Sequence, residues 1–233
     1  MSVGNRVFLQ RELPDMELVK RYQRLPAANV ADTMSRSCAL NSEIHLISSP
    51  DRPIMAGPAL TVKARPGDNL MLHKALDMAQ EGDVIVVSND GDRTHSLMGE
   101  IMAIYAQNKG KVAGIVLDGP IRDMEELSQM SLFLYATGST PGGPYKEGPG
   151  EINVPISIGN IAVKPGDIIL GDRDGVIVIP QEDAASIIDG AEAYAAMDAG
   201  KVEEAKNGTS KRQWVEDTLA KKNVEIIDGT YKG

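Results

Sequence analysis

Two unbroken aliphatic runs constrain the fold of this chain more than any other feature. Val84-Ile-Val-Val87 and Val176-Ile-Val-Ile179 carry no polar side chain on either face. A strand of this kind must be covered on both faces, which is typical of sheets packed between other layers. Helical patterns alternate with strands through the middle of the chain, whereas 132–179 is almost all strand and turn. The sequence therefore predicts an α/β protein with a β-rich second half.

Hydrophobic periodicity also predicts where the elements lie and how the chain is divided. The predicted strands cover residues 59–63, 83–88, 112–118, 132–136, 155–158, 161–163, 167–170 and 175–179, and the predicted helices cover residues 15–24, 26–36, 69–80, 96–109, 123–130, 181–199 and 211–222. We expect a single α/β domain over 1–180, followed by a helical tail over 181–233. The tail is charged and rich in alanine. It could pack on a neighbouring subunit or on its own domain.

A short sequence device precedes two of the predicted strands. Gly82-Asp83 and Gly166-Asp167 are each followed directly by aliphatic residues. Glycine supplies the backbone conformation of a tight turn, and aspartate hydrogen-bonds the nearby backbone. The device therefore predicts a turn that leads into a buried strand.

Composition excludes several classes of function. The chain has 24 Lys and Arg against 33 Asp and Glu, a net charge of −9, and no basic block, which argues against nucleic-acid binding. A single cysteine, Cys38, excludes an intramolecular disulfide and a cysteine-based zinc site. No apolar run reaches the ~18 residues of a membrane span, and the first residues lack the apolar core of a signal peptide. We therefore expect a cytoplasmic protein without a membrane partner.

The segment 138–151 is unusually rich in glycine and proline. It contains no phosphate-binding glycine pattern, so it gives no support to nucleotide binding. A loop of this length without regular structure is often functional, as a lid or an interface arm. The alternative is a rigid surface connection.

The clearest candidate site follows the predicted strand 112–118, where a sharp turn leads to Arg122 and Asp123. Ligands of open α/β sheets bind in the crevice beyond the carboxyl ends of the strands. Arg122 presents a planar fork of donors for a carboxylate or keto-acid oxygen, and Asp123 could hold a hard cation such as Mg²⁺. Two alternatives stay open. Arg122 could form a surface ion pair, and Asp123-Met-Glu-Glu126 is the pattern of a helix-capping box.

Gly99 lies inside a helical pattern, where glycine costs about 1 kcal/mol relative to alanine and so needs a reason. One reason is that an anionic substrate approaches the free amides of Gly99, Glu100, Ile101 and Met102. The other is close helix packing. The histidines, His45, His73 and His95, are scattered without a catalytic pattern, so we expect them to be structural or exposed.

Several motifs together resemble one known family. They are Gly67-Asp-Asn69, Gly82-Asp-Val-Ile-Val-Val, Gly99-Glu100, Val112-Ala-Gly-Ile-Val-Leu-Asp-Gly-Pro-Ile-Arg-Asp123, Pro165-Gly-Asp167 and Asp172-Arg-Asp-Gly-Val-Ile-Val-Ile-Pro180. In this order and spacing, over roughly residues 26–182, the chain resembles the aldolases of 4-hydroxy-4-methyl-2-oxoglutarate and 4-carboxy-4-hydroxy-2-oxoadipate. That family also contains the regulator of ribonuclease E activity A.

The resemblance implies a swivelling-type β/β/α fold with a mixed sheet, assembled into homotrimers or homohexamers with the active site at a subunit boundary. It also implies a divalent cation, Mg²⁺ or Mn²⁺, and a pyruvate-like product. Carried over by position, Arg122 grips the keto acid, Asp123 the metal, the 99–102 backbone the carboxylate, and Glu100 a metal-bound water.

One feature departs from the family pattern, which is an acidic residue, a spacer of twenty residues and then Arg-Asp. Here 21 residues, 101–121, separate Glu100 from Arg122. We expect the additional residue to bulge in the turn at Lys109-Gly-Lys111. This departure affects the placement of Glu100 rather than that of the Arg-Asp pair.

The function that these residues predict is metal-dependent retro-aldol cleavage of a 4-hydroxy-2-oxo acid to give pyruvate, which makes the protein a carbon–carbon lyase. Oxaloacetate decarboxylation passes through the same enolate and is expected as a side activity. Two alternatives remain. One is a non-catalytic regulator that binds a ribonuclease, and the other is a lyase for a different 2-oxo or sugar acid.

Overall fold

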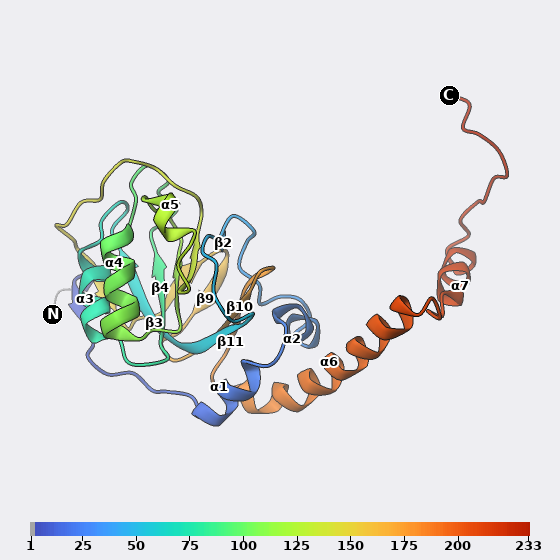
Figure 1. The fold of residues 1–233 in the computed structure, drawn as a ribbon, viewed down its shortest axis with the longest axis horizontal. Coiled ribbons are helices and arrows are strands. Elements are labelled where there is room, and N and C mark those ends of the chain that lie inside the picture. The colour runs from blue at the N-terminus through green and yellow to red at the C-terminus, as the bar shows by residue number, and fades with distance from the viewer. Residues whose placement is uncertain (1–2) are drawn as a thin grey trace. The chain divides into compact units, whose positions relative to one another are not determined.

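The computed structural model describes residues 3–233, which divide into two compact units, one ending at Ala195 and one formed by Ala196–Gly233 (Figure 1). The first unit is a mixed α/β structure, and the predicted fold class is confirmed. Its strands are β1 (Arg6–Val7), β2 (His45–Leu46), β3 (Met55–Ala64), β4 (Val84–Ser88), β5 (Gly114–Leu117), β6 (Phe133–Ala136), β7 (Gly150–Ile152), β8 (Ile156–Ile158), β9 (Ile161–Val163), β10 (Ile168–Asp172) and β11 (Gly175–Ile179).

The helices differ in length and in where they begin. They are α1 (Met16–Tyr22), α2 (Ala27–Thr33), α3 (Leu70–Met78), α4 (Glu100–Tyr105) with the π-helical η1 (Ala106–Gly110), α5 (Met124–Leu127), α6 (Ala184–Lys206) and α7 (Gln213–Lys221). Every predicted helix is present. The short strands β1, β2 and β7 were not predicted, because two or three residues are too few to show a periodic pattern.

Four neighbouring parallel strands form the centre of the main sheet, in the spatial order β3-β4-β5-β6. Every residue of β4 is buried, as its unbroken aliphatic run predicts. Because the four strands are parallel, the segments that follow them all emerge at one edge of the sheet. That edge holds the candidate site.

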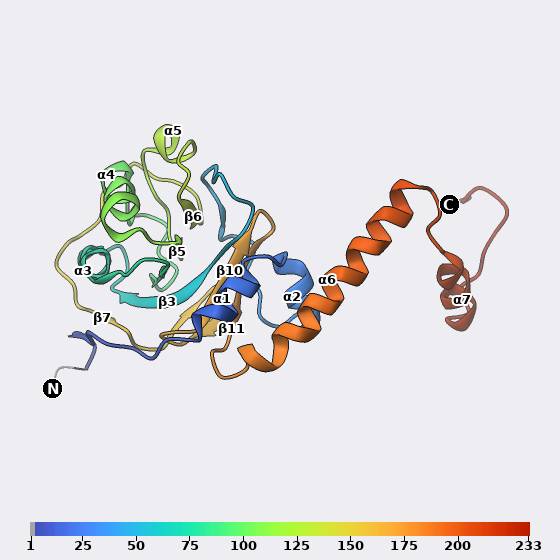
Figure 2. The same cartoon turned by 60° about the horizontal axis from the view of Figure 1, so that its bottom comes forward.

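The sheet is covered by helices on one face and by further strands on the other. One core cluster joins strand residues such as Leu60 and Ile85 to Leu72 of α3, Ala103 of α4 and Leu127 of α5. In Figure 2, helices α3, α4 and α5 lie on the same side of the parallel strands. A second cluster joins the opposite face of the sheet to β8–β11. This layering is the predicted β/β/α arrangement.

Strand β3 links the two sheet layers because it pairs with different strands along its length. Residues 55–58 pair antiparallel with β10, and residues 59–63 pair parallel with β4. A third core cluster packs α1, α2 and the first turns of α6 against the β10–β11 hairpin. One long buried strand therefore fixes the parallel sheet on the hairpin layer.

Both copies of the Gly-Asp device form the predicted turn. Gly82 and Gly166 have a φ of 89°, in the left-handed region that favours glycine. Asp83 accepts a hydrogen bond from the amide of Gln80 at 2.8 Å, and Asp167 accepts one from the amide of Lys164 at 2.7 Å. Asp83 also forms an ion pair with the Arg11 side chain.

The predicted helix over 96–109 begins later than expected and changes form at its end. Gly99 is extended, with φ −141° and ψ −166°, so α4 starts at Glu100. The last turn, Ala106–Gly110, is π-helical and is followed by Lys111 in a left-handed conformation with a φ of 46°. A π turn closes on the fifth residue rather than the fourth, so it takes up one additional residue. It overlaps the segment where the longer spacer predicts a bulge.

The C-terminal segment has few buried residues of its own. In α6 the buried residues are Ala184, Ile188 and Ala191, and α7 has none.

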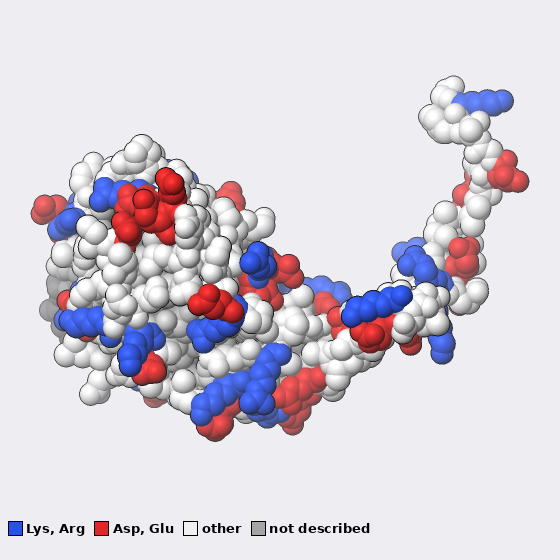
Figure 3. All heavy atoms as spheres, viewed as in Figure 1, with Lys and Arg blue, Asp and Glu red and all other residues white. Residues whose placement is uncertain are grey.

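No helix in residues 3–233 combines the length and apolar character that a membrane span requires. On the face drawn in Figure 3, acidic and basic side chains are interspersed. Packing of the tail on a neighbouring subunit stays a prediction.

The ion pair between Arg11 and Asp83 should contribute strongly to stability. Their side chains are only 7% and 2% exposed, so Arg11→Met leaves a buried carboxylate without its cation. We expect the free energy of unfolding to fall by about 3 kcal/mol, as measured by urea denaturation. Lys20→Met, which breaks an exposed pair with Glu17, is the control and should cost less than about 0.5 kcal/mol. Equal losses in the two variants would contradict this role.

Candidate active site

A small cavity lies at the edge of the sheet where the four parallel strands end. Its volume is about 140 Å³, and we call it the Asn69 cavity. The segment after each of the four strands contributes to its wall. The lining residues are Asn69 and His73 after β3, Ser96, Met98, Gly99, Ile101 and Met102 after β4, Arg122 and Asp123 after β5, and Pro144 and Lys146 after β6.

Arg122 and Asp123 also line a second, more open hollow of about 400 Å³, shared with Met124 and residues 139–141. The two side chains are 48% and 40% exposed, and Arg122 Nε lies 3.9 Å from Asp123 Oδ2. Both therefore face space that a ligand can enter. The structure brings the predicted pair to the edge of a cavity.

Asp123 does not cap its own helix, so that alternative is wrong. Its backbone is left-handed, with φ 61° and ψ 47°, and its side chain makes no hydrogen bond to the first turn of α5. Instead, Asp123 Oδ2 accepts a hydrogen bond from the amide of Glu100, at the start of α4, at 2.9 Å. The carboxylate caps the neighbouring helix and keeps its other oxygen, Oδ1, available.

Gly99 is required by this contact. A Cβ at residue 99 would clash with Asp123 Oδ2 and would lie 3.1 Å from Arg122 Cγ. Glycine therefore allows the Arg-Asp pair to approach the start of α4. The sequence analysis gave two reasons for Gly99, close packing and the approach of a substrate. The close packing is observed, and it occurs in the wall of the cavity.

The first turn of α4 supplies amides to the cavity. Within residues 3–233, the amide of Glu100 is paired with Asp123, whereas no acceptor pairs with the amides of Ile101 and Met102. Gly99, Ile101 and Met102 all line the cavity. Of the four amides predicted to hold a carboxylate, the amide of Glu100 already donates to Asp123. The amides of Gly99, Ile101 and Met102 remain for a ligand.

The Glu100 side chain is not among the residues that line the Asn69 cavity or the open hollow. What brings Glu100 to the site is its backbone amide. Its predicted role in orienting a metal-bound water stays a prediction.

Two residues in the cavity were missed by the sequence analysis, His73 and Lys146. Burial lowers the pKa of His73, and the charge of Lys146 lowers it further. His73 belongs to α3, and its position two turns before the end of a helical pattern carries no catalytic signal. Lys146 belongs to the glycine- and proline-rich loop, whose backbone path the sequence could not predict.

That loop is held firmly along the cavity. The amides of Glu147 and Gly148 donate to Asp68 Oδ2 at 2.7 and 2.8 Å. The amide of Tyr145 donates to the Gly67 carbonyl at 2.8 Å, and that of Asn69 donates to the Tyr145 carbonyl at 3.0 Å. These bonds fix the backbone on both sides of Lys146.

Asp123 fits a magnesium-type site with few protein ligands. In the described part of the chain, no group of three or more His, Cys, Asp or Glu side chains could hold a metal ion. Mg²⁺ needs no such group, because it is usually bound by one or two carboxylates and keeps several waters. Asp123 Oδ1, which accepts no hydrogen bond from a described residue, provides one such ligand.

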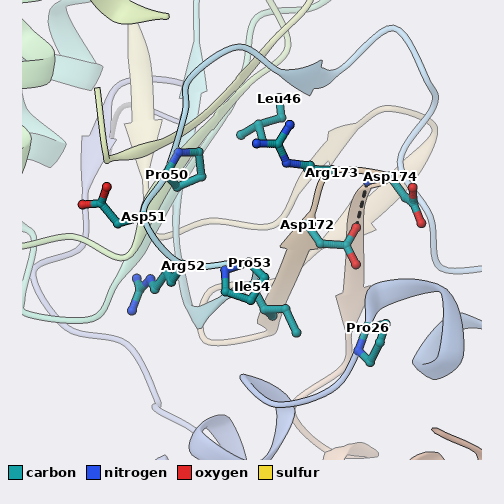
Figure 4. A pocket seen from close by; sticks show the side chains of 10 residues that line it. All are labelled: Pro26, Leu46, Pro50, Asp51, Arg52, Pro53, Ile54, Asp172, Arg173 and Asp174. Atoms are coloured by element: carbon teal, nitrogen blue, oxygen red, sulfur yellow. Dashed lines mark hydrogen bonds between the residues drawn. The ribbon is translucent and has the colours of Figure 1, made fainter. Parts of the chain in front are cut away.

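A larger pocket of about 500 Å³ lies among Pro26, Leu46, residues 50–54 and residues 172–174 (Figure 4). Two of its charged side chains already serve the fold. Both oxygens of Asp172 accept backbone amides, from Ala27 and Asp174, and Arg52 packs over the Phe133 ring. The motif that begins at Asp172 therefore builds the β10–β11 turn and the start of α2. We place the candidate site at the Asn69 cavity instead.

Comparison with known proteins shows the family of this chain. The chain matches the family described as RraA-like, Aldolase/RraA, over residues 27–178. The chain belongs to the RraA-like family. The matched residues include the Arg-Asp pair, Gly99 and the strands that position them.

Relatives in this family carry aldolase names. A protein from Halalkalibacterium halodurans, named "Putative 4-hydroxy-4-methyl-2-oxoglutarate aldolase", is 34% identical over 187 residues, which are 80% of this chain and 88% of the relative. A Thermus thermophilus protein named "4-hydroxy-4-methyl-2-oxoglutarate aldolase" is 37% identical over 49% of this chain and 69% of its own. These RraA-like relatives support a carbon–carbon lyase.

Solved structures share the fold and carry a second kind of name. Streptomyces coelicolor RraAS2, described as "an unusual member of the RNase ES inhibitor RraA protein family", has a TM-score of 0.70 at 28% identity, covering 85% of this chain and 99% of its own. The "RNA-processing inhibitor RraA from Thermus thermophilis" has a TM-score of 0.60 at 32% identity, covering 66% of this chain and 92% of its own.

The environment of His73 gives a direct test of the cavity. Because burial and the charge of Lys146 both disfavour the imidazolium, NMR titration of the His73 ring should give a pKa below that of a free histidine. Lys146→Met removes a positive charge and should raise this pKa. Lys74→Met, on the exposed side of α3, should change it less. An unchanged His73 pKa in Lys146→Met would place Lys146 outside the cavity.

Proposed function

We propose that this RraA-like protein cleaves a 4-hydroxy-2-oxo acid by a retro-aldol reaction and releases pyruvate. The observation that carries the proposal is the position of Arg122 and Asp123, which face a cavity beside the unpaired amides of Ile101 and Met102. The Arg122 guanidinium and the two amides can donate to the oxygens of a 2-oxo carboxylate, and the free oxygen of Asp123 can hold a divalent cation beside it.

Each residue has a distinct role in binding. The substrate carboxylate accepts hydrogen bonds from the amides of Gly99, Ile101 and Met102, and the Arg122 guanidinium donates to the 2-oxo oxygen. Asp123 would hold a divalent cation, Mg²⁺ or Mn²⁺, through Oδ1. Bound there, the cation would supply Lewis acidity at the 2-oxo group.

The reaction requires only one bond to break in the carbon skeleton. The C4 hydroxyl loses its proton as the C3–C4 bond breaks, C4 becomes a carbonyl carbon, and the electron pair passes to C3. The resulting pyruvate enolate carries negative charge on its oxygen, which Arg122 stabilises. A proton delivered to C3 completes pyruvate. We expect water to take and return the proton, with Glu100 as its orienting group.

The same chemistry extends to oxaloacetate. Loss of carbon dioxide from C4 leaves its electron pair on C3 and produces the same enolate. Arg122 would stabilise that charge in the same way, so slow decarboxylation is the expected side activity.

The assembly is proposed to be a cytoplasmic homotrimer or dimer of trimers, with the cavity near a subunit boundary. Support comes from apolar side chains on the helices beside the cavity. Ile101 is 81% exposed, Ile104 is 43% exposed and Met124 is 37% exposed. Exposed apolar side chains that gather near one site are typical of a surface that another subunit covers.

Asp123→Asn tests the proposal most simply. Asparagine tolerates the left-handed backbone of residue 123 and keeps an acceptor for the Glu100 amide, but it lacks the charge that holds a cation. With Mg²⁺ and either a 4-hydroxy-2-oxo acid or oxaloacetate, pyruvate formation should fall at least about a hundredfold. A coupled lactate dehydrogenase assay measures the pyruvate.

Asp90→Asn is the matched control, because residue 90 is exposed and also left-handed, with a φ of 47°. It should retain the activity of the unaltered protein. Turnover by Asp123→Asn at the same rate as the control would remove Asp123 from the mechanism.

A second candidate function is regulation of a ribonuclease by protein contact, which the names of two structural neighbours favour. The acidic chain would suit docking on a basic partner. The oxaloacetate assay separates the candidates, because a pure binder yields no pyruvate above the rate with Mg²⁺ alone. A lyase for another 2-oxo or sugar acid would instead turn over a different member of a substrate panel.

A further inference from the structure

We propose that His73 is the acid–base group of the site, which takes the proton of the substrate C4 hydroxyl and returns a proton to C3 through a water that Asn69 holds. This inference rests on the proposed function, in which the proton passes through water, and it names the side chain that receives the proton. The Glu100 side chain, the expected orienting group, does not line the cavity, whereas His73 and Asn69 both do.

Helix α3 presents Asn69 and His73 to the same cavity. Asn69 is the N-cap of this helix, and the amide of His73 donates to the Asn69 carbonyl at 3.0 Å. Residues four apart lie on one face of a helix, with their Cβ atoms about 5–6 Å apart. Because both side chains line the cavity, one water between them can bond to both.

The Asn69 side chain supplies a buried acceptor. The residue is 2% exposed, and its Oδ1 has no hydrogen-bond partner among the described residues. Its Nδ2 donates to the Leu97 carbonyl at 2.9 Å, which only the NH₂ end of the amide can do, so Oδ1 is the free end. A buried acceptor without a donor is rare in folded proteins. An ionised 2-oxo acid group has acceptor oxygens only, so the donor that Oδ1 requires is a water or a hydroxyl.

The His73 ring is available to exchange protons. Among the described residues, no hydrogen-bond partner engages its nitrogens. Burial and the charge of Lys146 lower its pKa, so the ring is mostly neutral at neutral pH. A neutral imidazole carries one N–H and one basic nitrogen, so it can accept a proton where Asn69 can only accept a hydrogen bond.

His73 also connects the cavity with a second hollow. A groove of about 260 Å³ shares three lining residues with the Asn69 cavity, which are His73, Ile101 and Met102. The nitrogens of an imidazole lie on two edges of the ring, so it can accept a proton at one and release a proton at the other. His73 can therefore exchange its proton with solvent in the groove between turnovers.

The protons balance within one turnover. The water donates one hydrogen to Asn69 Oδ1 and one to His73, and its oxygen accepts the C4 hydroxyl hydrogen. As the C3–C4 bond breaks, the hydroxyl proton passes to the water, a water proton passes to the ring, and the electron pair passes to C3. The imidazolium then returns a proton to C3 through the same water, which completes pyruvate and leaves the ring neutral.

The test compares two reactions that share the pyruvate enolate but differ in proton transfer. Exchange of the pyruvate methyl protons with D₂O requires a base, whereas oxaloacetate gives the enolate by losing carbon dioxide. Both are measured on the full-length protein with MgCl₂, by NMR for exchange and by absorbance for oxaloacetate. We expect His73→Gln to slow exchange about a hundredfold but oxaloacetate consumption less than about threefold.

Asn69→Ala tests the positioning of the water separately. It removes the acceptor for the water and keeps the base. Exchange should therefore slow about tenfold, as the loss of one hydrogen bond allows, and should keep the same dependence on pH.

The pH dependence of exchange gives a readout that a structural role would not move. Because the neutral ring is the base, exchange in the unaltered protein should rise with pH through the pKa of His73, and His73→Gln should lose this rise. Lys146→Met removes a positive charge, so the rise should move to higher pH. The titratable or charged groups that share a wall with His73 are Lys146, Arg122 and Asp123 in the cavity and Asp77 and Tyr105 in the groove.

His45→Gln is the matched control, because it makes the same replacement at an exposed histidine of β2 and should leave both rates unchanged. Circular dichroism melting of each variant confirms folding. Equal losses of exchange and oxaloacetate consumption in His73→Gln would assign the residue a structural role and overturn the proposal. Exchange at the full rate in His73→Gln would overturn it as well.

The outcomes separate the acid–base role from the proposed function. If the unaltered protein consumes oxaloacetate but does not exchange pyruvate protons, or exchanges them without His73, the proposed function stands and this inference fails. If it does neither with Mg²⁺ or Mn²⁺, the proposed function fails and the inference fails with it.

Discussion

The hydrogen bond from the Glu100 amide to Asp123 Oδ2 is the interaction on which the rest of the site depends. It joins the segment after β4 to the segment after β5. Through it, the Asp123 carboxylate caps the N-terminus of α4 while its second oxygen stays free. The bond is formed only because residue 99 has no side chain and residue 123 adopts a left-handed backbone. The left-handed backbone of Asp123 is a local exception to ordinary backbone preferences, and it lies where the chemistry is proposed.

The sheet explains why so few residues suffice to build the site. Four adjacent parallel strands direct four following segments to one edge, and each segment supplies a different kind of group. The segment after β3 gives the buried Asn69 side chain and an imidazole, and the segment after β4 gives backbone amides. The segment after β5 gives the Arg-Asp pair, and the segment after β6 gives a lysine. Relatives in the RraA-like family carry aldolase names or ribonuclease-inhibitor names, so one scaffold is associated with more than one kind of function.

Much of this could be predicted from the sequence because the signals are local. The aliphatic runs fix the buried strands, the Gly-Asp pairs fix their turns, and Arg122-Asp123 follows a buried strand directly. What could not be predicted depends on contacts between segments distant in sequence. The capping of α4 by Asp123 needs the two segments to be placed together, and the position of Lys146 depends on a loop anchored by Asp68.

The longer spacer between Glu100 and Arg122 illustrates the limit of motif spacing. The π-helical turn at Ala106–Gly110 and the left-handed Lys111 lie in the segment where the longer spacer predicts a bulge before β5 begins. In this structure the amide of Glu100 donates to Asp123. The spacing between Glu100 and Arg122 predicts a bulge. The structure is needed to see how the backbone of that segment runs and whether Glu100 reaches Asp123.

A crystal structure of the protein soaked with Mn²⁺ and pyruvate would test the central claim most directly, since anomalous scattering locates the cation without ambiguity. The account predicts Mn²⁺ coordinated by Asp123 Oδ1, with the pyruvate carboxylate on the amides of Ile101 and Met102 and its 2-oxo oxygen at Arg122. A cation bound away from Asp123, or pyruvate bound in a different cavity, would contradict it.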